Sequence, residues 1–218
     1  MRAVVCSLLV LCSAGPALAQ SGSTLPRWDV SGSVGWLAGD KSAFAEDWND
    51  WYDTFAASVD VGHYWSPHVK TEAGALFTTD GLVYSQQRFV RPNEAYATYF
   101  THEHQFRVAA VTLAAAYQFF DNQWVHPFVS AGVQLTWEHE RIYSPEQILY
   151  GRDPFTRLVV IPAIDRDEGW RLEVLPMAGA GAKFYVNERG FIRTDATVAW
   201  RDGGIGQVAW RAGIGIDF

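Results

Sequence analysis

The last eleven residues of the chain, "VAWRAGIGIDF" (208–218), alternate between two kinds of side chain. One side of the alternation carries Val208, Trp210, Ala212, Ile214, Ile216 and Phe218, and the other carries Ala209, Arg211, Gly213, Gly215 and Asp217. A repeat of two residues predicts a β-strand with two chemically different faces. The pattern alone does not say which solvent each face meets, so the rest of the chain must decide.

The same alternation returns in seven earlier segments, which gives eight predicted strands. With the last one, they are residues 28–38, 54–65, 69–79, 106–120, 124–138, 170–186, 191–201 and 208–218. Each is at least about as long as the 9–11 residues that a tilted membrane strand needs. The connections alternate between short turns (66–68, 121–123, 187–190) and longer loops (39–53, 80–105, 139–169), with 202–207 a short exception. This alternation predicts an up-and-down antiparallel meander with both chain ends on the short-turn side.

Two barrels fit eight antiparallel strands: a soluble lipocalin-like carrier with an apolar interior, and a membrane barrel with an apolar exterior. The polar faces of the strands favour the membrane barrel, because seven acids nearly balance six bases there, whereas the whole chain has a net charge of −7. They are Asp29, Asp60, Lys70, Glu72, Glu138, Arg171, Glu173, Lys183, Arg193, Asp195, Arg201, Arg211 and Asp217. Such balance is expected of enclosed, mutually paired charges, and a solvated outer face is the alternative.

Tryptophan positions point the same way. Trp28 and Trp65 lie at the short-turn ends of the apolar faces. The long-loop ends carry Trp36, Trp137, Trp170, Trp200 and Trp210. Two such girdles are typical of the two interfaces of a membrane, although large aromatic residues can also close the ends of a soluble core.

The first 19 residues read as a secretory signal peptide, with Arg2 followed by a short apolar run that ends on Ala17-Leu18-Ala19. Both cysteines, Cys6 and Cys12, lie inside it, and lipidation at Cys12 is the alternative. Without Arg2, 16 basic and 24 acidic residues remain, a net charge of −8, which argues against nucleic acid as a partner.

The terminal phenylalanine after alternating apolar residues resembles the C-terminal assembly signal of bacterial outer-membrane proteins. With the segments "VHPFVSAGVQ" and "AGAGAKFYVNERGFIRTD", residues 28–218 resemble the small eight-stranded outer-membrane barrels of the OmpA/OmpX type. The resemblance implies an all-β, eight-stranded antiparallel transmembrane barrel in the cell outer membrane, with short periplasmic turns and long extracellular loops. It also implies that Phe218 is recognised by the barrel-assembly machinery.

For function, we expect a monomer without cofactor or catalysis that acts structurally or through surface contacts of its loops, since members of this fold share architecture rather than activity. Outer-membrane lipid, lipopolysaccharide and an extracellular ligand of the loops are the expected partners. Two alternatives remain open: a lipid A-modifying, deacylase-like enzyme and the soluble carrier.

Eight strands leave an interior just wide enough for side chains, so paired charges are expected to close it. If Gly190 takes the left-handed position of a three-residue turn, Lys183 lies opposite Asp195, and Tyr185 lies opposite Arg193.

A turn centred on Asn122 would bring His104 opposite Glu140, with His102 nearby. Imidazole and carboxylate together suit a zinc-type ion, so these three residues are weak candidates for a metal site. A polar loop base in which several histidines coincide is the alternative, because "HEH" has no diagnostic spacing.

Ser144 shares the face of Glu140, so a serine, a base and an acid could gather at the outer rim. In an extended strand, however, Ser144 would lie about 13 Å beyond Glu140, too far for contact. The expected catalytic set is therefore empty.

The first long loop combines acidic and aromatic residues: Asp40, Glu46, Asp47, Asp50, Asp53, Trp48, Trp51 and Tyr52. It lacks the spacing of an EF-hand, so we expect a solvated acidic loop rather than a calcium site, with aromatics that could touch lipopolysaccharide or a partner. In the third loop, Leu158 to Ile161 is expected to extend the neighbouring strands as a hairpin.

Overall fold

The computed structural model describes residues 27–40, 51–90, 97–120, 124–149, 159–202 and 204–218. These residues form β1 (Trp28–Asp40), β2 (Trp51–Tyr64), β3 (Val69–Thr78), β4 (Gly81–Val90), β5 (Ala97–Gln118), β6 (Val125–Ser144), β7 (Gln147–Leu149), β8 (Val159–Ile161), β9 (Ile164–Tyr185), β10 (Gly190–Arg201) and β11 (Gly204–Asp217). No helix in this part of the chain is long and apolar enough to cross a bilayer. The predicted signal peptide, residues 1–19, lies outside the described residues.

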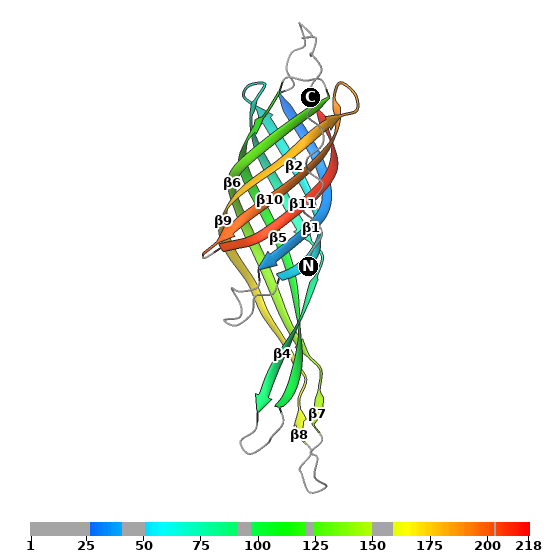
Figure 1. Cartoon of the computed structure of the whole chain (residues 1–218), viewed down its shortest axis with the longest axis vertical. Helices are drawn as coiled ribbons and strands as arrows, with labels where there is room; N and C mark the ends of the chain where they lie inside the picture. Colours follow the sequence, from blue (N-terminus) through cyan, green and yellow to red (C-terminus); the bar gives the residue numbers. More distant parts are fainter. Residues whose placement is uncertain (1–26, 41–50, 91–96, 121–123, 150–158, 203) are drawn as a thin grey trace.

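Eight of the strands close into the predicted antiparallel barrel (Figure 1). The pairing runs β3-β2-β1-β11-β10-β9-β6-β5, and a further pairing of β3 with β5 closes the ring. The last strand pairs with the first from Asp29↔Asp217 to Gly39↔Gln207. At this seam the Phe218 amide donates to the Trp28 carbonyl at 2.9 Å, so the backbone leaves no open edge between the chain ends.

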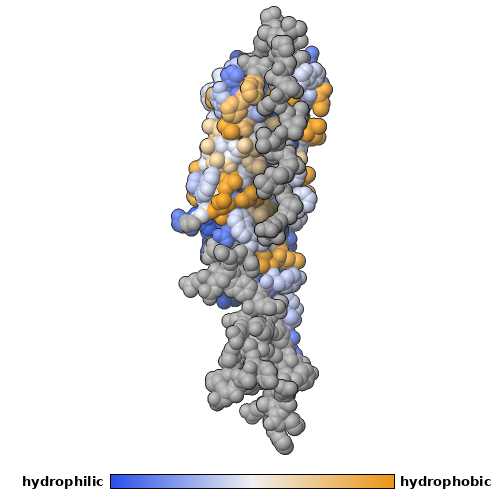
Figure 2. Space-filling view, viewed as in Figure 1, coloured by the Kyte–Doolittle hydropathy of each residue, from blue (hydrophilic) through white to orange (hydrophobic). Residues whose placement is uncertain are grey.

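The apolar faces of the strands point outward, as predicted. Leu113 and Ile214 are 59% and 72% exposed, whereas Lys70 and Lys183 are fully buried. Figure 2 shows the apolar side chains on the wall of the barrel. Exposed tryptophans mark both ends: Trp28, Trp65 and Trp124 at the short turns, and Trp36, Trp51, Trp170, Trp200 and Trp210 toward the long-loop end. A surface of this kind is solvated by hydrocarbon between two interfacial belts.

One part of the wall continues far beyond the rest. β5 and β9 each have 22 residues, whereas β10 has 12. Past the end of β3, β4 takes its place beside β5, from Gly81↔Phe106 to Val90↔Ala97. The four strands β4, β5, β6 and β9 therefore form a sheet that projects from the long-loop end, and we call it the projecting sheet (Figure 1).

The segments 80–105 and 139–169 are thus largely strand rather than loop. The expected extension of the neighbouring strands is confirmed, because β6 and β9 stay paired out to Ser144↔Ile164, and β7 and β8 form a separate two-stranded sheet in which Val159 lies opposite Leu149. Between Glu140 and Arg141 the register with β9 shifts, and Gly169 there has a φ of 78°. Glycine adopts this left-handed conformation without steric cost, so the bulge lets the two strands continue.

Two predicted turn registers are wrong by two residues. Lys183 lies opposite Arg193 rather than Asp195, and Tyr185 lies opposite Phe191 rather than Arg193. The reason is the turn: Asn187 Oδ1 accepts hydrogen bonds from the amides of Arg189 and Gly190, which centres the turn one residue earlier.

The turn between β5 and β6 shows the same kind of shift. Glu140 lies opposite Phe106, and His104 lies opposite Ile142. The predicted turn centre, Asn122, lies outside the described residues.

Candidate functional site

The polar faces of the strands meet inside the barrel, and near the short turns they form a first group of ion pairs. Lys70 and Lys183 are both bonded to Asp29; the Lys70 Nζ–Asp29 Oδ2 distance is 2.8 Å. Lys183 also lies 3.4 Å from Asp217 and donates to the Tyr64 hydroxyl at 2.8 Å. Because these five residues come from five different strands, β1, β2, β3, β9 and β11, the group ties opposite sides of the wall together.

A second group fills the middle of the barrel. Arg193 is paired with Glu72 and, at 2.7 Å, with Asp195. Arg211 lies 2.8 Å from Asp195 and 3.5 Å from Asp60. All five side chains are buried, so each charge is offset by an opposite charge rather than by water.

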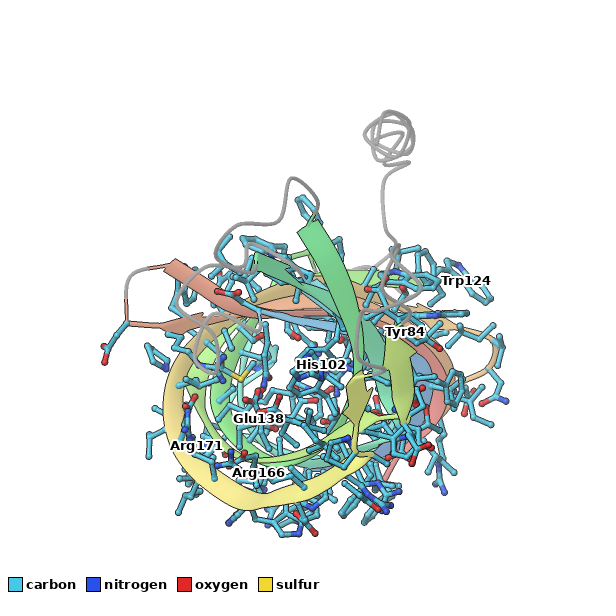
Figure 3. All side chains as sticks on the ribbon, turned by 90° about the horizontal axis from the view of Figure 1, so that it is seen from below. Tyr84, His102, Trp124, Glu138, Arg166 and Arg171 are labelled. Carbon is cyan, nitrogen blue, oxygen red and sulfur yellow. The ribbon has the colours of Figure 1, made fainter. Side chains whose placement is uncertain are left out.

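A third group is centred on Glu138, which points into the barrel when the molecule is viewed from the long-loop end (Figure 3). Arg201 donates to it at 2.8 Å and to Glu173 at 2.6 Å. Gln207 and Tyr52 also donate to Glu138, at 2.6 and 3.2 Å. One carboxylate thus collects donors from β2, β10 and β11.

Next to this third group, the long-loop end of the interior also holds an apolar cluster, and Val108 of the cluster lies directly opposite Glu138. Its buried residues are Leu37, Tyr52, Ala56, Leu76, Val83, Phe106, Val108, Ala110 and Ala209. The rings of Tyr52 and Phe106 stack with centroids 4.6 Å apart. These apolar residues share the inward faces with the charged ones, so paired charges are only part of what fills the barrel.

The three weak metal candidates lie at the mouth of the barrel, on β5 and β6. His104 Nδ1 and Glu140 Oε1 are 2.7 Å apart, so the predicted contact exists although the two residues are not directly opposite. His102 lies two residues further along β5, and burial together with the neighbouring imidazole of His104 lowers its pKa. Within the described residues no group of three or more metal-ligating side chains is assembled.

The other candidates are dispersed. Ser144 is buried on β6 opposite Ile164, four residues beyond Glu140. Tyr52, expected in an exposed acidic loop, lies instead inside the barrel, and Asp53 is exposed beside it. Tyr52 shares the inward face of Thr54. Extending the predicted strand by two residues toward the N-terminus would therefore have placed Tyr52 inside the barrel. The remaining acidic loop residues Glu46, Asp47, Trp48 and Asp50 lie outside the described residues.

The projecting sheet carries exposed ion pairs. Arg141 binds Asp165 through two hydrogen bonds of 2.6 and 2.8 Å, and these bonds lower the pKa of Asp165. Arg107 binds Asp80 in the same two-pronged way, at 2.8 and 2.9 Å. Arg171, predicted among the inward charges, is exposed near the rim. The described side chains of the sheet thus combine these exposed ion pairs with exposed apolar and aromatic residues, Leu82, Tyr84, Tyr143 and Ile164.

Residues 5–218 match the family described as the outer membrane protein beta-barrel domain. The chain belongs to this family. Its place is the cell outer membrane, and the apolar outer wall, the two tryptophan belts and the closed ring of strands agree with that assignment.

Solved structures give the same fold. Neisserial surface protein A is 9% identical, with a TM-score of 0.52, over 88% of this chain and 97% of that one. The outer membrane protein OprG from Pseudomonas aeruginosa is 10% identical, with a TM-score of 0.50, over 90% of this chain and 98% of that one. No curated protein matches the sequence. At these identities the likeness shows the fold alone.

Proposed function

We propose that this protein is a closed, non-enzymatic outer-membrane barrel that acts at the cell surface through its projecting sheet. The observation that carries the proposal is the contrast between the two ends of β5, β6 and β9. Inside the membrane, the inward side chains of these strands form ion pairs or pack in the apolar cluster. Beyond the membrane, the same strands carry exposed polar side chains on a sheet that is continuous with the barrel. Such a surface suits contact with another molecule rather than transport.

A closed interior has a direct test in planar lipid bilayers. Two groups of buried ion pairs fill the barrel near the short turns and in its middle, and a third lies beside the apolar cluster at the long-loop end, so the inserted protein is expected to give no discrete conductance steps. Single-channel steps at neutral pH would contradict this part of the proposal.

The outward placement of the projecting sheet can be tested by labelling, because the chain has no cysteine after residue 12. Tyr84→Cys lies on the projecting sheet and Trp65→Cys at a short turn, and both positions are exposed. On intact cells, a membrane-impermeant maleimide should label the first variant and spare the second until the outer membrane is permeabilised. The reverse pattern would place the sheet in the periplasm.

Lipopolysaccharide is the proposed first contact of the projecting sheet, since it forms the surface from which the sheet emerges. A variant in which Val83 and His104, which lie opposite each other, are joined by an Asn-Gly turn removes the far end of β4 and β5. We expect it to keep the heat-modifiable gel mobility of a folded barrel and to bind purified lipopolysaccharide less well. Unchanged binding would remove the sheet from this role.

The absence of catalysis is tested with the same lipid. After incubation with wild-type protein, lipid A is expected to keep all its acyl chains by mass spectrometry. Loss of a chain would favour the deacylase-like alternative. Recognition of Phe218 by the assembly machinery also belongs to the proposal, and it is supported by the 61% exposure of that side chain at the seam.

A further inference from the structure

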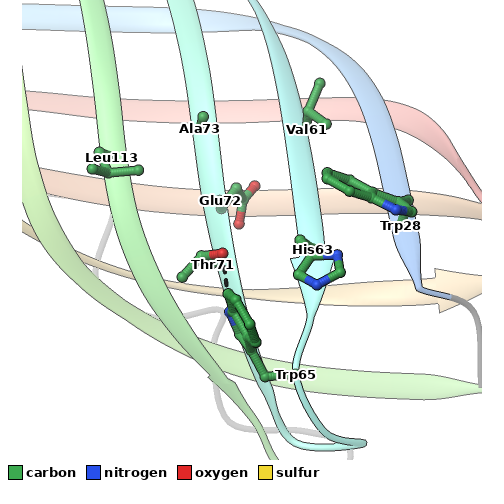
Figure 4. A pocket seen from close by; sticks show the side chains of 8 residues that line it. All are labelled: Trp28, Val61, His63, Trp65, Thr71, Glu72, Ala73 and Leu113. Atoms are coloured by element: carbon green, nitrogen blue, oxygen red, sulfur yellow. Dashed lines mark hydrogen bonds between the residues drawn. The ribbon is translucent and has the colours of Figure 1, made fainter.

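The outer wall of the barrel is hollowed at the short-turn end of β2 and β3. The hollow has a volume of about 430 Å³ and opens to the side of the barrel that faces lipid (Figure 4). Ala73 forms its floor, because the strand registers place this small residue directly between Val61 and Leu113. Both neighbours are exposed and taller, so they stand as the walls of a groove.

The next row of side chains toward the turn is polar and aromatic. His63 lies opposite Thr71 on one side and opposite Trp28 on the other. Trp65 folds back over this row, and its indole donates to the Thr71 hydroxyl at 3.2 Å (Figure 4). Successive side chains on one face of a strand are about 7 Å apart. The lining of the groove therefore changes from apolar to polar over about that distance along the strands.

His63 packs between two tryptophan rings in that row. Its ring centroid lies 4.4 Å from that of Trp28 and 4.8 Å from that of Trp65. Its Nδ1 atom is buried and has no hydrogen-bond partner. A buried N–H without an acceptor costs more than a buried lone pair without a donor, so the proton is assigned to Nε2. No hydrogen bond of Nε2 is recorded in the described part of the chain, which leaves a fixed donor at the polar end of the groove.

We propose that this groove is a binding site for one phospholipid of the periplasmic leaflet. The order of side chains along the groove matches the order of chemistry along such a lipid at this depth: an acyl chain over Ala73, then the ester and phosphate oxygens beside His63. Trp28 and Trp65 belong to the short-turn tryptophan belt, where headgroups meet hydrocarbon. The choice of the periplasmic leaflet rests on the outward placement of the projecting sheet proposed above, whereas the groove itself lies at the opposite end of the barrel and can bind lipid whether or not the sheet binds lipopolysaccharide.

The site can be tested by native mass spectrometry of the full barrel released from detergent with added dipalmitoyl phosphatidylethanolamine. Ala73→Phe fills the floor of the groove, and His63→Phe keeps the ring but removes the donor. The matched control is Ala180→Phe, an outward alanine of β9, a strand that contributes no residue to the groove. Heat-modifiable gel mobility shows that each variant is folded.

The wild type is expected to retain one phospholipid. His63→Phe should weaken retention about fivefold, the factor that corresponds to one neutral hydrogen bond. Ala73→Phe should weaken it at least as much, and Ala180→Phe should leave it unchanged. Equal retention by His63→Phe and wild type would overturn the proposal, even if Ala73→Phe failed to fold.

Two further results would also overturn it. Dipalmitoylglycerol retained as well as the phospholipid would show that no headgroup contact is made. A dimer that disappears in Ala73→Phe would show that the groove is covered by a second copy of the chain rather than by lipid.

Discussion

Replacing Lys183 with methionine tests whether the buried ion pairs hold the barrel together. Methionine keeps most of the length of the side chain but leaves Asp29 and Asp217 facing each other without the cation between them. Removing one partner of a buried pair costs about 3–5 kcal/mol. Asp29 keeps Lys70 at 2.8 Å, so we expect the lower end of that range, about 3 kcal/mol of unfolding free energy.

The assay is urea unfolding in lipid vesicles at pH 8, followed by tryptophan fluorescence. Arg141→Met is the matched control, because it breaks an exposed ion pair on the projecting sheet and should leave the unfolding midpoint unchanged. A double-mutant cycle identifies the partner. Coupling of Lys183→Met to Asp29→Asn should be about 1–3 kcal/mol, and larger than its coupling to Asp195→Asn.

Two results would refute the reasoning. If Lys183→Met unfolds at the wild-type urea concentration, the charge contributes nothing to stability. If the coupling to Asp195 exceeds the coupling to Asp29, the strand register expected from a left-handed Gly190 holds, and the observed one does not.

Further predictions concern backbone packing and protonation. Gly35→Ala should lower unfolding free energy by about 1–3 kcal/mol, because its Cβ would lie 1.9 Å from the Trp210 carbonyl oxygen. Gly32→Ala, whose Cβ meets nothing within 4 Å, should be neutral in the same urea assay, and equal effects would contradict the packing described. The pKa of His102, followed by NMR, should lie below 6.5, and His104→Asn should raise it because a like charge is removed. The folded chain then binds fewer protons at His102 than the unfolded chain does, so the projecting sheet should lose stability as the pH falls through about 6.5. A His102 pKa above 6.5 in the folded protein would contradict this direction of the pH dependence.

Strand positions and their two faces could be predicted from the sequence because both depend on a local repeat. The segment 208–218 alternates so regularly that its two faces could be assigned from the local sequence, and the charge balance and tryptophan positions of the whole chain then identified the face with Ile214 and Ile216 as the outward one. The same rule placed Lys70 and Lys183 inside the barrel. Chain closure followed from the need to leave no open edge in lipid.

Partners inside the barrel could not be predicted, because they depend on the register set by each turn. Hydrogen bonds of the Asn187 side chain centre the turn between β9 and β10 one residue earlier than predicted. Lys183 therefore does not lie opposite Asp195, and it pairs instead with Asp29, 154 residues away in the sequence. Long side chains also reach diagonally, which is why His104 still meets Glu140 although another residue lies opposite each of them.

The projecting sheet and the apolar cluster were missed for a different reason. In the segment 80–105, the charged and polar residues of β5 near His104 hide the alternation of the strand, so the sequence predicts a loop there. Phe106 and Leu37 lie on the mostly polar faces of their strands. A search for paired charges on those faces does not reveal apolar residues, so the apolar cluster is not predicted. Both features become visible once neighbouring strands are aligned.

The central claim is that apolar side chains face acyl chains and that charged ones are enclosed. The most direct test is NMR of the methyl-labelled protein in lipid nanodiscs, which needs no substitution. Methyl groups of Val59, Leu113 and Ile214 should show nuclear Overhauser effects to acyl-chain protons, and those of the buried Leu37 and Val108 should show none. Contacts of Leu37 and Val108 with lipid, together with none from Leu113, would contradict the account.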